Sequence, residues 1–494
     1  MTKLTTIPAS IMCDFYKITH KLFYPAGTTE IYSTWTPRSA QYFPIETDYA
    51  VAFGFQIFVN KYLVGYFNEH FFAKTEDEVA GEYEYVIENT LGGNVDSSHI
   101  RALHRLGYLP LEIKAVPEGT KVPMKVPTLT IRNTKPEFYW LTNYFETIMS
   151  SELWLASNSA TIASHYRRIL DTWALATTGT TAGVEFQGHD FSFRGMQGLD
   201  SAVSSGLGHL LSFVGTDNIP AIVGAEMYYR AKLSGRLVGT SVPATEHSIM
   251  SSFGRDEVKA FNSIIDSVPT GIVSIVSDTY DFWGVLTNVL PTLKDKIMTR
   301  DGKVVIRPDS GNPVDIICGT SRFGGTTPEE KGAIQLLWET FGGTISHQGF
   351  KVLDSHIGLL YGDAITAERA TEICTRLFEK GFASTNVVFG IGSFTYSYVT
   401  RDSLGYALKA TYAKINGEEV FIEKDPKTDK NNLKKSLTGK VAVIKSASGI
   451  VAVDHLNDEQ EANFGGNMLR TIFKDGDIYN ESTLKEVQDR LHGK

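Results

Sequence analysis

The chain has 494 residues, a formal net charge of −9, and a composition of 42% hydrophobic and 21% charged residues. This composition is typical of globular proteins and excludes wholesale disorder or a fibrous repeat. The acidic balance argues against a general nucleic-acid-binding protein, because such proteins need a basic surface. At about 150 residues per domain, the length predicts two to three domains.

Cysteine usage and apolar runs indicate a reducing compartment and no membrane segment. The three cysteines, Cys13, Cys318 and Cys374, show no CxxC spacing, so we expect neither a disulfide framework nor a structural zinc site. No apolar run approaches the roughly 18 residues of a membrane span. The N-terminal sequence also lacks the apolar core and cleavage site of a signal peptide. We therefore expect a cytoplasmic protein with no membrane partner.

The first third of the chain mixes strand and helix patterns. Residues 29–35 and 111–116 alternate between apolar and polar residues, like half-buried strands. Residues 51–66 read as a helix, 137–155 as a second, buried helix, and about 160–177 as a third.

Between residues 180 and 395 the pattern becomes repetitive. Short apolar runs end in polar or glycine residues and are often followed by a helical stretch; the seven runs are 184–186, 211–214, 239–242, 272–276, 304–306, 357–361 and 387–389. This order predicts parallel strands with crossover helices. A β/α barrel builds its active site at the carboxyl ends of its strands, and an open doubly wound sheet uses the same ends.

After residue 395 the pattern returns to strands, at 406–415 and 441–453, separated by a lysine-rich stretch over 423–440. That stretch fits a solvated loop, or a mobile lid that reaches an anion. We predict an α/β protein with an irregular, about seven-stranded β/α barrel and a β-rich α+β domain formed by both chain ends. The predicted parts are 1–150, 151–395 and 396–494.

Arg307 and Asp309 lie just past one apolar run, so both can point into one site. Arginine offers a forked donor for phosphate, and aspartate a carboxylate for ribose hydroxyls, a metal or a developing cation. The alternative is an Asp-capped turn with a surface arginine. Glycines in 361–366 and 387–394 follow two successive strands, where backbone N–H groups can approach a phosphate.

Further acids follow other predicted strands. Asp190, Asp217 and Asp278 are individually typical helix caps, but together with Arg194 and Arg307 they favour a site for a Mg²⁺-bound polyphosphate.

Two other features are weaker evidence for a functional site when each is taken alone. His247 follows a predicted strand, although a lone histidine is more often structural, and no HxxxH pair indicates zinc. Near the N-terminus, Tyr16 belongs to an amphipathic first helix or stacks on a flat ring.

Taken together, these motifs resemble the nicotinamide phosphoribosyltransferase family of type II phosphoribosyltransferases. The resemblance runs from Asp14 to about Phe473 and rests on an ordered set of motifs: DFYKITH, FGFQ, LEIKAVPEG, YWLTNYFET, HDFSFRG, GTD, SVPATEHS, VSDTYD, IRPDSGNP, YGD, FGIGS, TRD and KDP. It implies a glycosyltransferase of NAD salvage that joins nicotinamide to 5-phosphoribosyl 1-pyrophosphate (PRPP), giving nicotinamide mononucleotide and pyrophosphate. It also implies a homodimer with active sites at the subunit interface.

The resemblance assigns roles residue by residue. Phe191 and the partner's Tyr16 sandwich nicotinamide, Asp217 accepts the carboxamide N–H and disfavours nicotinate, and Arg307 lies near the base. Asp278 and Asp309 lie near the ribose and a Mg²⁺ ion carried by pyrophosphate. The ribose and phosphate contacts are Arg194, Gly362, Asp363, Gly392, Ser393, Arg401 and Lys409. The pyrophosphate and ATP contacts are Arg38, Arg194, His247, Arg307 and Lys424.

His247 matches the histidine that ATP phosphorylates in this family, since imidazole is a nucleophile at cellular pH. The implied cofactors are Mg²⁺ and ATP as co-substrate, with no organic prosthetic group. Three local departures from the family pattern stand out: Ser393 in place of a frequent glycine, Ala407 in place of a frequent serine, and Ser192 in HDFSFRG.

Other functions fit parts of the pattern. Nicotinate phosphoribosyltransferase shares the fold and mechanism, but Asp217 argues against it. A barrel glycosidase explains paired carboxylates but not the arginines and glycine loops. A catalytically silent ligand-binding homologue is the third alternative.

Overall fold

The structure is a computed structural model that describes residues 4–93, 95–362, 365–424 and 436–493. The chain forms two compact units. Unit 1 comprises 1–161, 225–231 and 399–494, and unit 2 comprises 162–224 and 232–398. The sequence-based bounds 1–150, 151–395 and 396–494 stay a prediction about domains.

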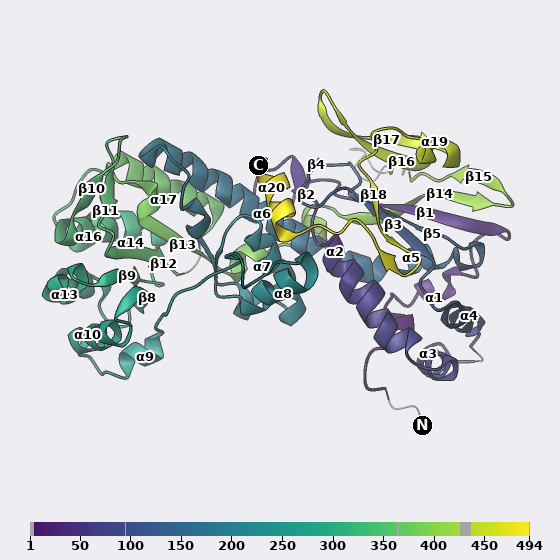
Figure 1. Ribbon diagram of the computed structural model, residues 1–494, viewed down its shortest axis with the longest axis horizontal. Coiled ribbons are helices and arrows are strands. Elements are labelled where there is room, and N and C mark those ends of the chain that lie inside the picture. Colours follow the sequence, from purple (N-terminus) through teal and green to yellow (C-terminus); the bar gives the residue numbers. More distant parts are fainter. Residues whose placement is uncertain (1–3, 94, 363–364, 425–435, 494) are drawn as a thin grey trace. The chain divides into compact units, whose positions relative to one another are not determined.

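Unit 1 is built on an antiparallel sheet whose strands come from both ends of the chain (Figure 1). Its order is β15 (Glu418–Phe421), β14 (Ala407–Ile415), β1 (Thr28–Thr36), β5 (Leu129–Asn133), β3 (Leu111–Ala115), β18 (Arg470–Lys474) and β19 (Asp477–Ile478). Trp35 on β1 is buried and stacks on Tyr406, with 5.0 Å between ring centroids. The predicted strands 29–35, 111–116 and 406–415 are confirmed.

Smaller elements complete unit 1. Two further strand pairs are β2 (Tyr49–Val51) with β4 (Lys121–Pro123), and the hairpin β16 (Lys440–Ser446) with β17 (Gly449–Leu456). The helices are η1 (Ala9–Ile11), α1 (Lys17–His20), α2 (Phe55–Phe58), η2 (Val59–Tyr66), η3 (Asn68–Phe72), α3 (Glu76–Leu91), α4 (Ser98–Leu106), η4 (Pro136–Phe138), α5 (Leu141–Tyr144), η9 (Arg401–Ser403), α19 (Asp458–Ala462) and α20 (Leu484–His492). The single run expected at 441–453 is therefore two strands joined by a turn.

Two helix predictions need correction. The helix expected over 51–66 begins only at Phe55, because residues 49–51 pair with β4, and from Val59 it is a π-helix. The helices expected over 137–155 and 160–177 are short turns followed by one helix, α6 (Glu146–Thr178). Polar residues inside α6 bond to the backbone of β2: Ser157 donates to the Val51 carbonyl at 2.6 Å, and Thr161 accepts from the Val51 N–H at 2.9 Å.

Unit 2 is built on a six-stranded parallel sheet. Its order is β7 (Gly215–Thr216), β6 (Gly188–Asp190), β13 (Val387–Ile391), β12 (Ile357–Tyr361), β9 (Asp301–Arg307) and β8 (Thr270–Val276). Isolated parallel bridges join Thr240 to Gly215 on one edge and Ala244 to Ser274 on the other. A curled parallel sheet is thus confirmed, and one segment, 240–244, is bridged to both of its edges.

The predicted runs are confirmed at 272–276, 304–306, 357–361 and 387–389, and wrong at the other three. Residues 184–186 form a 3-10 turn before β6, residues 211–214 connect the end of α7 at Leu210 to β7, and residues 239–242 contribute only an isolated bridge at Thr240. Periodicity cannot separate such short apolar runs from buried helix ends or loops.

The helices of unit 2 connect these strands, and α14 packs against both α16 and α17 (Figure 1). The bounds are η5 (Val184–Phe186), η6 (Phe193–Gly195), α7 (Leu199–Leu210), α9 (His247–Ser251), α10 (Glu257–Ser267), α11 (Phe282–Gly284), η7 (Val285–Val289), α12 (Leu290–Thr292), α13 (Lys294–Met298), α14 (Pro313–Cys318), α15 (Pro328–Lys331), α16 (Ala333–Phe341), α17 (Ala367–Glu379), η8 (Ser384–Asn386) and α18 (Ser393–Ser397), with the small pair β10 (Gly343–Ile345) and β11 (Lys351–Leu353). The division between the units runs through α6 and through α8 (Ile219–Tyr229). Among the described helices, none has the length and apolarity to cross a membrane.

Candidate active site

Carboxyl ends of the parallel strands in unit 2 surround a cavity of about 460 Å³. Parallel strands of one sheet bring their carboxyl ends to the same edge, which is why residues far apart in sequence meet here. The cavity is lined by Asp190, Phe191, Phe193, Arg194, Asp217, Ala244, Thr245, Glu246, Ile249, Arg307, Asp309 and Gly362. Seven of the predicted site residues are in this lining: Asp190, Phe191, Arg194, Asp217, Arg307, Asp309 and Gly362.

Asp217 follows β7 and is held through one of its two carboxylate oxygens. Its Oδ1 accepts a hydrogen bond from His189 Nε2 at 2.9 Å and another from the Ser241 hydroxyl. Burial acts to raise the pKa of Asp217, but these hydrogen bonds, with the nearby Arg307 charge, outweigh it and lower the pKa. Asp217 is therefore a carboxylate at neutral pH. The sequence analysis assigned no role to either donor, although both lie in quoted motifs.

An aromatic ring lies beside this carboxylate. Phe191 directly follows β6, and its N–H donates to the Ile391 carbonyl at 2.9 Å. Its ring packs against His189 with 4.5 Å between centroids and 35° between planes. A flat apolar face next to a carboxylate suits an aromatic ring that carries a hydrogen-bond donor.

Arg307 ends β9 and is half-buried in the cavity wall. Its guanidinium donates to the Thr245 carbonyl. Burial lowers the pKa of Arg307, and the charges of Asp309 and Asp217 oppose that shift. Arg194 on η6 also lines the cavity and is exposed, so two cations are available to an anionic ligand.

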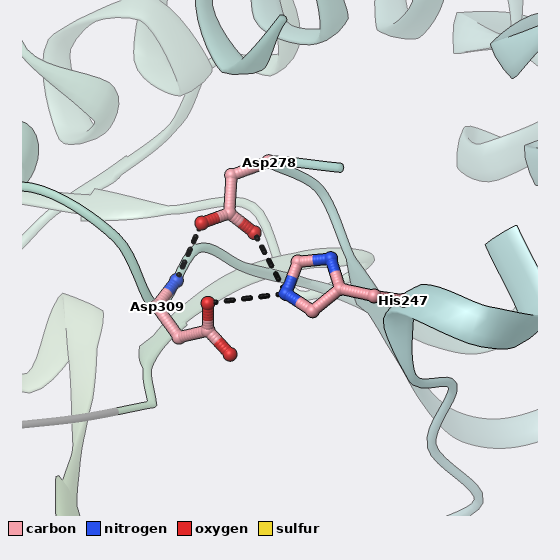
Figure 2. A group of neighbouring side chains, drawn as sticks. All are labelled: His247, Asp278 and Asp309. Carbon is pink, nitrogen blue, oxygen red and sulfur yellow. Dashed lines mark hydrogen bonds and ion pairs between the residues drawn. The ribbon is translucent and has the colours of Figure 1, made fainter. Parts of the chain in front are cut away.

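His247, Asp278 and Asp309 form a cluster at the same strand ends (Figure 2). The Asp278 carboxylate is almost fully buried, and its Oδ2 accepts from the Asp309 N–H at 3.0 Å and the Ser310 N–H at 2.9 Å. His247 Nε2 lies 3.2 Å from Asp309 Oδ1 and 3.9 Å from Asp278 Oδ1. Burial acts to raise the pKa of Asp278, but the Ser310 and Asp309 donors lower it overall.

This cluster has the donors that a divalent cation needs. One ligand atom from each of the three residues lies within 4.8 Å of the others. Asp278 Oδ1 is buried and accepts no hydrogen bond from the described residues. Carboxylate oxygens are the ligands preferred by Mg²⁺, which usually keeps several waters and binds through one or two carboxylates plus phosphate. The residues therefore fit the ion that the family implies.

The glycine loop after β13 lies against η6. Gly392 precedes α18, and Ser393 is its first residue. A Cβ added to Gly195 would lie 2.0 Å from Ser393 Oγ, so only glycine fits at position 195 while Ser393 stands opposite. The loop thus packs next to Arg194, although neither Gly392 nor Ser393 lines the cavity among the described residues.

Several remaining predicted residues gather in unit 1. Lys409 on β14 lies 3.9 Å from Glu146 Oε1. Burial lowers the pKa of Lys409, Glu146 opposes the shift, and the positive charges of Arg38, Lys424 and Lys17 add to it. Arg38 donates to the Gly405 carbonyl at 2.6 Å. Of these cations, Arg38, Lys409 and Lys424 are residues that the family resemblance assigns to phosphate contacts, and they form a second basic group.

Two other predicted residues, Tyr16 and Arg401, have simpler surroundings. Tyr16 is exposed in unit 1, with its ring edge against His20 at 5.0 Å between centroids. Arg401 on η9 pairs with Asp402 at 2.9 Å. Asp363 lies outside the described residues.

Comparison with known proteins identifies the family. The profile of the Nicotinate phosphoribosyltransferase (NAPRTase) family matches residues 186–477. The chain belongs to this family. Nicotinamide phosphoribosyltransferase of Acinetobacter baylyi is 49% identical over 490 residues, covering 97% of this chain and 96% of the relative. The protein of the same name from Mycoplasma pneumoniae is 34% identical over 436 residues, covering 85% of this chain and 92% of the relative.

Solved structures share the fold of this NAPRTase-family chain. Nicotinate-nucleotide pyrophosphorylase from Pyrococcus furiosus has a TM-score of 0.56 and 16% identity, covering 100% of this chain and 98% of that one. Human nicotinic acid phosphoribosyltransferase has a TM-score of 0.56 and 15% identity, covering 99% of this chain and 93% of that one. At such low identity the likeness concerns the fold alone.

Proposed function

We infer that this chain is a nicotinamide phosphoribosyltransferase. It transfers the phosphoribosyl group of PRPP to nicotinamide, giving nicotinamide mononucleotide and pyrophosphate for NAD salvage. The observation that carries the inference is the Asp217 carboxylate, held through one oxygen beside the Phe191 ring in a cavity that also contains Arg307. Relatives named for this activity match nearly the whole chain and support it.

In the proposed mechanism, nicotinamide stacks on Phe191 and donates its carboxamide N–H to Asp217. The ring nitrogen then attacks ribose C1 while the bond from C1 to pyrophosphate oxygen breaks. Positive charge develops on the ribose, and a carboxylate fixed near it lowers the barrier, because preorganised charge is usually the largest catalytic contribution. Asp309 is our choice for that carboxylate.

The leaving pyrophosphate needs positive charge. Arg194 and Arg307 supply it within unit 2, and Asp278 and Asp309 would hold Mg²⁺, which neutralises pyrophosphate when bound. We propose that Gly392 and Ser393 take the 5′-phosphate, that Gly362 and Asp363 take the ribose hydroxyls, and that Arg38, Arg401, Lys409 and Lys424 complete the phosphate contacts. The last four lie in unit 1, and we propose that Tyr16 and Arg401 act on the partner subunit of a homodimer.

His247 is proposed to accept a phosphoryl group from ATP. A ring nitrogen attacks the γ-phosphorus, the bond from that phosphorus to the bridging oxygen breaks, and ADP leaves. The contacts of His247 with Asp309 and Thr279 orient the ring for this step. Phosphorylation then improves substrate binding and is outside the glycosidic step.

We also propose that segment 240–244 closes the sheet of unit 2 into an irregular barrel of about seven strands. Its bridges to β7 and β8 support this. Closure matters for function because Ser241 and Thr245, which contact Asp217 and Arg307, belong to this segment or directly follow it. A cytoplasmic location stays a prediction.

The deciding experiment incubates the protein with PRPP, Mg²⁺ and either nicotinamide or nicotinate, with and without ATP, and quantifies mononucleotide and pyrophosphate. Nicotinamide mononucleotide is the expected product. Formation of nicotinate mononucleotide alone would instead favour nicotinate phosphoribosyltransferase, and cleavage of a neutral glycoside without PRPP would favour a glycosidase.

A further inference from the structure

We propose that His189 and Ser241 act as a two-donor clamp that orients the Asp217 carboxylate and thereby sets the preference for an amide over an acid. This inference rests on the proposed function and adds two positioning residues to it. Neither residue needs to touch the reacting atoms, because both act through Asp217.

Both donors reach the same oxygen atom. His189 Nε2 is 2.9 Å from Asp217 Oδ1, and the Ser241 hydroxyl donates to that same Oδ1. Among the described residues, no donor reaches Asp217 Oδ2. A carboxylate fixed through one oxygen leaves the other with a defined direction, which is what a single carboxamide N–H requires.

The three residues come from segments that meet at β7. His189 on β6 pairs with Gly215 on β7, and Gly215 is bridged to Thr240, which precedes Ser241. The Asp217 N–H donates to the Asp190 carbonyl at 3.0 Å. A Cβ on Gly215 would lie 2.9 Å from His189 Nδ1, so glycine lets the imidazole lie close to β7. The clamp is therefore set by sheet register rather than by flexible side chains.

The two donors differ in one useful respect. The His189 ring also packs against Phe191, the proposed stacking ring, whereas the Ser241 hydroxyl donates to the Asp217 carboxylate. Loss of His189 should disturb both stacking and orientation. Loss of the Ser241 hydroxyl should disturb orientation alone, so Ser241 separates the two effects.

Charge explains why orientation controls selectivity. With both donors present Asp217 is ionised, so the carboxylate of nicotinate meets a like charge while the amide N–H of nicotinamide meets an acceptor. A site built to pair one polar group rejects the analogue that cannot make that pair. A carboxylate that swings freely can turn away from nicotinate and no longer presents an acceptor to nicotinamide.

The test compares donor-removing and donor-keeping variants of the full-length chain. Ser241→Ala and His189→Leu remove a donor, whereas Ser241→Thr keeps the hydroxyl, and His189→Gln keeps an N–H near the position of Nε2. The matched control is His356→Leu, which removes another histidine–aspartate contact, His356 Nδ1 to Asp354 Oδ1 at 2.6 Å. His356 precedes the amino end of β12, the end opposite the site.

The readout is the ratio of kcat/KM for nicotinamide to that for nicotinate, with KM for PRPP measured in parallel. We expect each donor-removing variant to lower the ratio about tenfold, the usual effect of one lost charge-assisted hydrogen bond. KM for PRPP should stay within twofold in Ser241→Ala. The donor-keeping variants and His356→Leu should retain most of the wild-type ratio.

The outcomes separate this inference from the proposed function. If wild-type protein makes no nicotinamide mononucleotide, the proposed function is wrong, and the clamp with it. If wild type is active but Ser241→Ala keeps the wild-type ratio within twofold, the clamp is wrong and the function stands. An equal loss in His356→Leu would also overturn the clamp, because it would indicate a general structural effect. If His189→Leu fails to fold, Ser241→Ala alone decides the test. Ser241 is exposed, so we expect that variant to fold.

Discussion

Asp309 is the carboxylate whose removal tests the proposed chemistry most directly. Asp309→Asn keeps the shape of the side chain but removes its negative charge, so the developing cation and the Mg²⁺ both lose a partner. We expect kcat to fall about 100- to 1,000-fold, the usual effect of losing one preorganised group at a transition state. Steady-state kinetics would measure this, with Asp354→Asn as control because Asp354 pairs with a histidine away from the cavity. Near-normal turnover in folded Asp309→Asn would contradict the role.

His247 is expected to link ATP to the reaction without taking part in glycosidic transfer. His247→Ala should abolish ATP stimulation and acid-labile phosphate on the protein, while some synthesis without ATP persists. Labelling with γ-phosphate-labelled ATP measures the first effect and product formation the second. Asp217→Asn serves as control, since it changes the base site and should still accept the label. Undiminished ATP stimulation in His247→Ala would rule out a phosphohistidine at this position.

Individual site residues were predictable where they directly follow a clear apolar run that predicts a strand. Arg307 and Asp309 follow a clear apolar run, and both line the cavity. The partners of Asp217 were not predictable, because which donors reach it depends on the pairing of β6 with β7 and on the bridge at Thr240. The pairing register of strands as short as β6 and β7 cannot be recognised from a pattern in the sequence.

Because η6 contacts the loop before α18, we expect substitutions at Gly195 and Ser393 to have coupled effects on KM for PRPP. Gly195→Ala should raise KM for PRPP at least several-fold, because its Cβ collides with Ser393 Oγ and shifts the neighbouring Arg194. Ser393→Gly should restore KM in the double variant, since it removes the opposing side chain. A double-mutant cycle on KM measures this coupling. Additive effects would show that the two elements do not constrain each other.

In unit 1, Glu118 joins three helical segments and should make stability depend on pH. Its Oε1 accepts from the Phe55 N–H at 2.6 Å, at the start of α2, and from the Tyr229 hydroxyl at 3.2 Å, at the end of α8. The Arg490 guanidinium on α20 donates to the Glu118 carbonyl. Burial raises the pKa of Glu118 from 4.5 to about 7, although its hydrogen bonds oppose the shift.

The sign of the pH effect follows from that raised pKa. Between pH 4.5 and 7 the unfolded chain has released this proton and the folded chain keeps it, so stability falls as pH rises. The difference amounts to about 3 kcal/mol over this window. Glu118→Gln cannot titrate, so its free energy of unfolding relative to wild type should rise from pH 4.5 to 7 and then level off. Urea unfolding at several pH values measures this, and an unchanged difference between the two proteins would contradict it.

Elements were predictable when they were long and regular. The strands at 272–276 and 357–361 carry enough apolar residues to be recognised, whereas β6 and β7 are too short and contain glycine. The continuity of α6 was not predicted: residues 156–159 separate the two expected helices but are helical, and the Ser157 hydroxyl among them donates to the Val51 carbonyl. Tertiary hydrogen bonds of this kind override local propensity.

The whole chain is acidic, but its proposed substrate is a polyanion, so cations must be concentrated locally. One group, Arg194 and Arg307, lies in unit 2, and the other, with Arg38, Lys409 and Lys424, lies in unit 1. Each unit alone therefore has only part of the positive charge assigned to phosphate binding. The proposed function assigns phosphate contacts to both groups, and for one site these residues come either from one chain or from the two chains of a dimer.

Subunit complementation distinguishes these two arrangements. If Arg401 acts on the partner's site while Asp309 acts in its own, a hybrid dimer of Arg401→Ala and Asp309→Asn chains contains one wild-type site and one site with both defects. Random pairing makes half of the dimers hybrid, so the co-expressed mixture should recover about a quarter of wild-type activity, although each variant alone is nearly inactive. Sequential purification on two different tags isolates the hybrids, which should show about half of wild-type activity. Each variant co-expressed with a differently tagged copy of itself is the control. If both residues act within the same chain, every site in every dimer carries one defect, and the hybrids show no more activity than the mean of the two variants.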